Sequence, residues 1–193
     1  MKPFRLLTLV LCLLIGMTAA AYASNFQSSS KYSGTVDYKG TGWAFDENAY
    51  DVEIIFKRVS GSQMVLGVGK DRDLIYKNAM PYYKYVSIQQ IYDTDSGKYA
   101  YIIQGANNQD GQGGFIYLMG YDNQKNTWQL YVNPANYYNP IGRGADPRMY
   151  VYNGQLILAF AEMGLHLPTQ EYHFFWDSNS NWFGYKDYGI VQH

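Results

Sequence analysis

Apolar and polar residues alternate along much of the chain. The clearest example is residues 50–59, where nearly every second side chain is apolar. A period of two residues is typical of a β-strand with one buried face. Further segments of this kind lie between corners rich in Asn, Asp, Ser and Gly, which favour tight hairpin turns. We expect strands at residues 50–59, 64–68, 74–76, 85–92, 99–104, 115–121, 128–132, 149–152, 155–161, 171–176 and 182–186.

No segment shows the period of 3.6 residues that predicts an amphipathic helix. Asn153-Gly154, between two apolar runs, is the strongest hairpin signal in the chain. We expect Met80-Pro81 to end any regular element, because proline cannot donate to a strand ladder. The longest irregular stretch is expected at residues 134–147, which contain three prolines. The pattern therefore predicts an all-β protein of antiparallel hairpins.

Two parts of the chain resemble each other. Residues 91–103 have a counterpart in residues 151–160, and the corner and tryptophan at residues 121–128 have one at residues 176–182. Self-similarity of this kind predicts repeated structural units. We expect meanders of four strands, with residues 50–68 as half of a further unit.

The hairpin at residues 120–128, with the sequence GYDNQKNTW, resembles the last hairpin of a kelch-type β-propeller blade. In that family a Tyr-Asp corner and a downstream Trp pack between blades. The resemblance covers about one blade and a degraded copy that ends at Trp182. The family's Gly-Gly pair ends the second strand of a blade, whereas Gly113-Gly114 opens the third expected strand here. The resemblance implies blade-like units in an incomplete, propeller-like set, because a closed propeller needs at least about four blades. A β-sandwich or barrel is the alternative.

The first residues have the features of a signal peptide. Lys2 and Arg5 precede an apolar run at residues 6–15, and small residues follow as far as Ala23. We expect residues 1–23 to be a cleaved signal peptide, which predicts a secreted, periplasmic or cell-surface protein. An uncleaved anchor is the alternative, although the run has half of the about 20 residues that span a bilayer. We expect a flexible leader and turns at 24–48 and one all-β domain at 49–193.

Composition narrows the chemistry of the mature chain. Cleavage after Ala23 leaves 170 residues with a formal charge of −3 and removes Cys12, the only cysteine. Disulfides and thiolate chemistry are therefore excluded from the mature chain. It has no basic stripe for nucleic acid and no second apolar segment for stable membrane insertion. Aromatic residues make up 18% of the full chain and charged residues only 16%, against a usual value of about 25% charged.

Four residues near one expected loop are candidates for chemistry. Glu162 and His166 lie in the loop, and Glu171 and His173 point to the same face of the next strand. The four together can form a Zn²⁺ site, and Glu162, His166 and His173 can act as an acid–base set. No H-E-x-x-H spacing is present, so hydrogen bonding for structure is the favoured interpretation.

Two acidic corners are candidates for calcium. Residues 93–97 and 177–181 space side-chain oxygens as the start of a Ca²⁺ loop does, but neither has the closing Glu of an EF-hand. We favour simple hairpin corners at both places. We expect no cofactor, with Zn²⁺ and Ca²⁺ as the open alternatives.

Aromatic residues beside Asn and Gln give a third kind of candidate site. Trp43, Tyr83, Tyr137 and Tyr138 can stack on a ligand, and Arg143 can hold a carboxylate. The alternative is that the tyrosines cover the sheet core with only the hydroxyl in water. We expect an exported bacterial binding protein for a glycan, a peptide or an envelope partner, and favour this over an enzyme. The alternatives are a small secreted hydrolase and a structural envelope component that pairs with its own copies into an oligomer.

Overall fold

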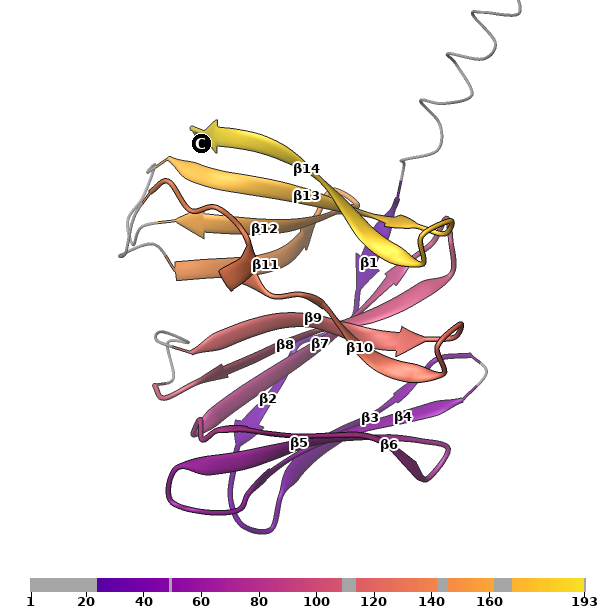
Figure 1. The fold of residues 1–193 in the computed structure, drawn as a ribbon, viewed down its shortest axis with the longest axis vertical. Coiled ribbons are helices and arrows are strands. Elements are labelled where there is room, and N and C mark those ends of the chain that lie inside the picture. The colour runs from indigo at the N-terminus through magenta and orange to yellow at the C-terminus, as the bar shows by residue number, and fades with distance from the viewer. Residues whose placement is uncertain (1–23, 49, 109–113, 142–145, 162–167, 193) are drawn as a thin grey trace, which may run out of the picture.

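The described strands form three antiparallel sheets that lie one above another (Figure 1). This arrangement confirms the all-β prediction. The only helical element that we describe is a single 3-10 turn, η2 (Pro134–Asn136). The computed structural model describes residues 24–48, 50–108, 114–141, 146–161 and 168–192.

Each sheet contains a run of four consecutive strands paired in chain order. The central sheet also carries two short strands, β1 and β2, on the outer edge of β7. The predicted four-strand units are therefore present, and the half unit of the sequence is part of a complete first sheet. The first sheet is β3 (Thr41–Asp46), β4 (Asp51–Arg58), β5 (Gln63–Lys70) and β6 (Asp73–Pro81); the central sheet is β1 (Phe26–Ser28), β2 (Tyr32–Thr35), β7 (Tyr85–Asp93), β8 (Lys98–Ala106), β9 (Phe115–Asp122) and β10 (Thr127–Val132); the last sheet is β11 (Asp146–Tyr152), β12 (Gln155–Ala161), β13 (Thr169–Asp177) and β14 (Trp182–Val191).

Burial differs between the outer sheets and the central one. In β4 of the first sheet, Val52, Ile54 and Phe56 are buried and alternate with exposed residues, because only one face meets a neighbouring sheet. In β8 of the central sheet both faces are covered. Tyr101 and its neighbours on that face pack toward the first sheet, and Ile102 and its neighbours pack toward the last. The continuous apolar run of β8 therefore follows from its central position.

The residues 24–48 are not the leader that the sequence suggested. They contain β1, β2 and β3, so the expectation of a flexible leader was wrong. Residues far along the sequence hold β1 in place. Phe26 is buried, and its N–H donates to the carbonyl of Gly154 (2.8 Å). Just before β1, Ser24 Oγ accepts the N–H of Trp176 (2.9 Å). Strands of three and four residues are too short to show a period in the sequence, and these form by pairing with the distant β7.

Met80-Pro81 ends a strand as expected, because Pro81 is the last residue of β6. Pro147, expected in an irregular stretch, lies instead within β11. Both strands lie at the edge of their sheet. Proline is tolerated there because an edge strand has N–H groups without a ladder partner.

Candidate functional site

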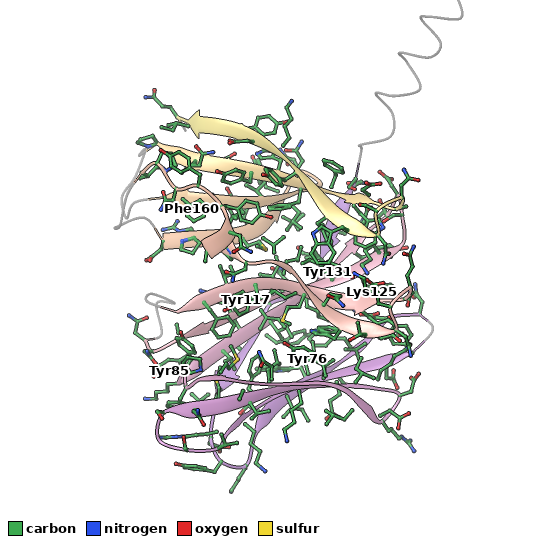
Figure 2. The ribbon with its side chains drawn as sticks, viewed as in Figure 1. Tyr76, Tyr85, Tyr117, Lys125, Tyr131 and Phe160 are labelled. Atoms are coloured by element: carbon green, nitrogen blue, oxygen red, sulfur yellow. The ribbon has the colours of Figure 1, made fainter. Side chains whose placement is uncertain are left out.

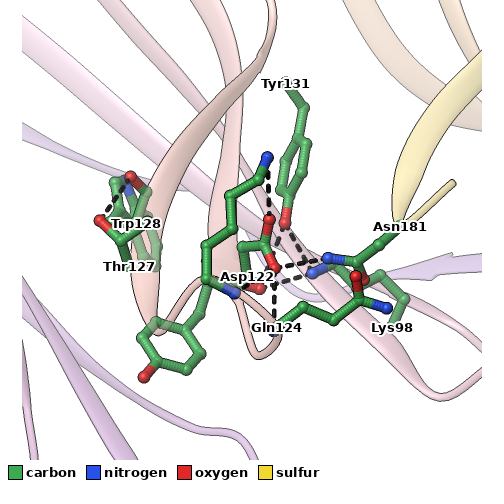
Figure 3. Close-up of polar contacts among 9 residues, drawn as sticks. Lys98, Asp122, Gln124, Thr127, Trp128, Tyr131 and Asn181 are labelled. Carbon is green, nitrogen blue, oxygen red and sulfur yellow. Dashed lines mark hydrogen bonds and ion pairs between the residues drawn. The ribbon is translucent and has the colours of Figure 1, made fainter.

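Buried charged groups connect the central and last sheets (Figure 3). The side chain of Asp122, at the end of β9, is inaccessible to solvent. Its Oδ1 accepts hydrogen bonds from the backbone N–H groups of Gln124 (3.0 Å) and Lys125 (3.1 Å) and from the amide of Asn181. Burial opposes ionisation, but these donors outweigh it and hold the pKa of Asp122 below its usual value. Because Asn181 belongs to the β13–β14 turn, the carboxylate links the two sheets.

Lys98 lies in the same junction. Its Nζ donates to the hydroxyl of Tyr131 (2.8 Å) and to the carbonyl of Tyr121 (2.5 Å), and lies 4.3 Å from the ring centroid of Trp176. Burial lowers the pKa of Lys98 to about 8, although the negative charges of Glu47 and Asp122 act to raise it. The amine lines none of the cavities described below, so we assign it to the joining of the sheets.

The junction between the first and central sheets uses the same kinds of group. Glu47 is 5% exposed, and its Oε1 accepts a hydrogen bond from the hydroxyl of Tyr101 (2.5 Å). Burial raises the pKa of Glu47 above its usual value, although bonds from Tyr101 and Tyr50 oppose the rise. Lys70 Nζ lies 4.1 Å and 4.0 Å from the ring centroids of Tyr50 and Tyr121. These cation–π contacts place a charge between two rings, where it also opposes the rise in the pKa of Glu47.

An aromatic crevice opens between the edge strand β6 of the first sheet and β9 and β10 of the central sheet. Its volume is about 180 Å³. Tyr83 and Phe115 meet edge to face at 5.1 Å, and Phe115 lies 4.8 Å from Tyr117 between ring centroids. Figure 2 shows Tyr76 and Tyr117, which come from the two facing sheets. The lining residues are Leu66, Tyr76, Asn78, Met80, Pro81, Tyr83, Phe115, Tyr117, Met119 and Leu130.

The hydroxyl groups of Tyr76 and Tyr117 in this aromatic crevice remain protonated. Burial raises the pKa of Tyr117, and the neighbouring hydroxyls of Tyr83 and Tyr76 raise it further. Burial also raises the pKa of Tyr76, against a hydrogen bond with Asn78. The crevice therefore combines apolar ring faces with neutral hydroxyl and amide groups, which is the chemistry of a small-molecule binding site.

A larger polar cleft, of about 440 Å³, lies on the central sheet, where β2, β7 and β8 run side by side. Ser33, Ser87 and Gln104 lie opposite one another across these strands. Figure 2 shows Tyr85, which also lines it. The complete lining is Lys31, Ser33, Gly34, Thr35, Tyr85, Val86, Ser87, Gln104, Ala106 and Asn108.

The structure brings two of the four Glu/His candidates together. Glu171 and His173 lie on the outer face of the last sheet, with His173 Nε2 at 2.9 Å from Glu171 Oε2. His173 Nδ1 lies 2.8 Å from Gln155 Oε1, and the ring stacks on Tyr188 at 4.1 Å. Glu162 and His166 lie outside the described residues. Within the described part of the chain, no three His, Cys, Asp or Glu side chains gather to hold a metal ion.

The acidic corners use their oxygens within the protein. Asp93 is 1% exposed; its Oδ1 accepts the N–H of Asn25 (2.8 Å) and its Oδ2 accepts the hydroxyl of Ser96 (2.5 Å). Asp177 Oδ1 accepts the N–H of Asn179 (3.0 Å). The residues at Asp93 do not fit a Ca²⁺ ion, because its carboxylate already binds protein donors and faces inward. Both corners have the geometry of simple turns.

The predicted aromatic residues do not share one surface. Tyr83 lies in the aromatic crevice. Trp43 packs over Gly34, beside the core between the first and central sheets. Tyr137 packs against Tyr172, with 5.2 Å between ring centroids. Tyr138 is 75% exposed. Arg143 lies outside the described residues. Sequence reasoning missed Tyr76, Phe115 and Tyr117, although the alternation of Tyr76, Asn78 and Met80 marks one face of β6.

Comparisons with known proteins add no relative from which a function could be inferred. The chain matches no protein-family model, no curated protein and no solved structure. Across the described residues, no helix has the length and apolar character needed to cross a membrane.

Proposed function

We propose that this protein is an exported binding protein that holds a glycan in the aromatic crevice. The observation that carries this proposal is the convergence of four aromatic rings and Asn78 on one opening between two sheets. Aromatic rings offer flat apolar faces that suit the faces of sugar rings, and amide and phenol groups can pair with sugar hydroxyls. Export rests on the signal-peptide features of residues 1–23.

The lining and the rigid surroundings of the aromatic crevice favour binding over catalysis. Its described lining contains no Asp, Glu or His, so it offers hydrogen-bonding groups and ring faces but no carboxyl or imidazole group to act as an acid or base. The crevice is also built from strands of two packed sheets, and a rigid scaffold reduces the ordering that a ligand must impose.

The proposal is tested by titrating the purified exported protein with neutral cello-, xylo- and chito-oligosaccharides in a calorimeter. At least one series should bind, and Tyr117→Ala should weaken that binding about tenfold, because a central aromatic contact contributes more than about 1 kcal/mol. Tyr152→Ala is the matched control, since Tyr152 is 63% exposed on the last sheet, away from the crevice. Equal affinities of the two variants would reject the aromatic crevice as the site.

A small hydrolase is the second candidate, and the contact between Glu171 and His173 favours it. In this alternative the pair acts with Glu162, which lies outside the described residues. A screen with chromogenic glycoside and ester substrates would support it if Glu162→Ala and His173→Ala abolish turnover while leaving the thermal melt unchanged. No turnover in the unaltered protein would reject it.

A further inference from the structure

The face of the central sheet that points toward the last sheet changes from apolar to polar residues along β7. At one end of β7, Ile91 is buried in the core between the two sheets. At the other end the same face carries Ser87, which pairs across the strands with Ser33 and Gln104. Packing against another sheet requires apolar residues and gives no reason for a polar row. The polar cleft described above is formed where this row begins.

Ser87 is the most enclosed polar residue of this row. It is 9% exposed and lies in the lining of the polar cleft. Ser33 and Thr35 add hydroxyl groups from the neighbouring strand β2. The polar cleft therefore presents several hydroxyl groups to any molecule that enters it.

Among the described residues, the charges at and beside the polar cleft are positive. Lys31 Nζ donates to Gln104 Oε1 (3.1 Å), and Lys84 Nζ lies 5.1 Å from the centroid of the Tyr85 ring. The described lining contains no Asp or Glu, and no ion pair of either lysine is found within the described residues. Lys31 as a whole is exposed, and partial burial of its amine lowers its pKa. An anionic group that enters the polar cleft can form a charge-assisted hydrogen bond with this amine.

We propose that the polar cleft binds a carboxylated sugar unit of the uronic-acid class, with the carboxylate at Lys31 and the sugar hydroxyls along Ser33, Ser87 and Gln104. A neutral sugar would leave the cation without an anionic partner, and a small inorganic anion would leave the hydroxyl row unused. The volume of about 440 Å³ lies within the range of about 300–1,000 Å³ of small-molecule sites. This site is separate from the aromatic crevice and does not depend on the function proposed for it.

The test compares galacturonic-acid oligosaccharides with galactose oligosaccharides of equal length and with inorganic phosphate, by calorimetry on the exported protein. The uronic-acid series should bind at least tenfold more tightly than the other two probes, and added salt should weaken its binding. Lys31→Met should weaken it about tenfold, while Lys31→Arg should retain most of it. Lys39→Met is the matched control, because Lys39 is an exposed lysine outside the polar cleft.

Several results would overturn this proposal. Absence of uronic-acid binding, equal binding of the galactose series, or equal binding of phosphate would each reject a uronic-acid site. Equal effects of Lys31→Met and Lys39→Met would show a general charge effect. Loss of uronic-acid binding in Tyr117→Ala, with Lys31→Met unaffected, would place the ligand in the aromatic crevice instead. Failure of the neutral oligosaccharides alone would reject only the earlier proposal, so the two outcomes are distinguishable.

Discussion

The two junctions between sheets each bury a carboxylate, but the pKa values of the two carboxylates shift in opposite directions. Each contains a buried carboxylate and a lysine that lies over two aromatic rings. At the junction of the central and last sheets, Asp122 has a lowered pKa, and at the junction of the first and central sheets, Glu47 has a raised one. The difference lies in the donors: Asp122 receives backbone N–H groups of its own turn, whereas Glu47 receives mainly phenol hydroxyls.

The comparison shows how a hairpin corner can keep a buried acid charged. Fixed N–H groups stabilise the carboxylate without any movement of a neighbouring charge. The signs of the pH dependence therefore differ. Asp122 contributes stability above its usual pKa, and that stability is lost as the pH falls through its lowered pKa. Glu47 instead makes the fold less stable as the pH rises from its usual value through its raised pKa.

The largest effect is expected when Asp122 is removed. Asp122→Ala leaves the N–H groups of Gln124 and Lys125 and the amide of Asn181 without their acceptor, so the free energy of unfolding should fall by about 3–5 kcal/mol. Asp177→Ala, at the corresponding corner of the last sheet, is the control. Its loss should be much smaller, because water can replace the acceptor at that exposed turn. Urea unfolding at pH 7 measures both, and equal losses would contradict the assigned role of Asp122.

A smaller effect is expected from the titration of Lys98. Its pKa of about 8 lies below its usual value of 10.5, so the unfolded chain binds more protons between these values. The free energy of unfolding should therefore rise by about 1 kcal/mol between pH 8 and pH 9, relative to the variant Lys98→Met. NMR of the lysine side chains should show one amine that titrates near pH 8 and is missing from Lys98→Met. A rise of equal size in both proteins would assign the titration to another group.

The smallest effect is expected at Glu47. Glu47→Gln keeps an acceptor for Tyr101 and removes a charge that burial disfavours, so stability at pH 7 should increase by about 0.5 kcal/mol. The gain should shrink as the pH falls through the raised pKa toward 4.5, the usual pKa of this carboxyl, and disappear below it, where the wild-type group is protonated in both states. Thermal melts from pH 4 to pH 8 measure the change. A loss of stability at pH 7 would show that the charge itself holds the junction.

Much of the fold could be predicted from the sequence, because period-two patterns and turn residues act over short distances. The strand β4 and the corner at Asn153-Gly154 were placed correctly on these signals alone. The strands β1 and β2 were missed, because each depends on the distant edge of β7 for its hydrogen bonds. Order in such segments follows from long-range pairing, which no local pattern records.

The candidate sites were harder to predict, for the same reason. Glu171 and His173 were placed side by side correctly, since two residues on one strand share a face. The aromatic crevice joins Tyr76 with Tyr117, residues of different sheets, and a sequence gives no register between sheets. Tyr83 was predicted to bind a ligand only because aromatic residues cluster around it in the sequence. Its ligand role stays a prediction, as do those of Trp43, Tyr137, Tyr138 and Arg143.

The short strand β1 also bears on the export that we propose. Cleavage after Ala23 would make Ser24 the first residue, and Ser24 Oγ already accepts a hydrogen bond from Trp176, in the last sheet. Two residues later, Phe26 fills the core between the central and last sheets. The proposed cleavage point therefore lies directly beside residues that join the central and last sheets.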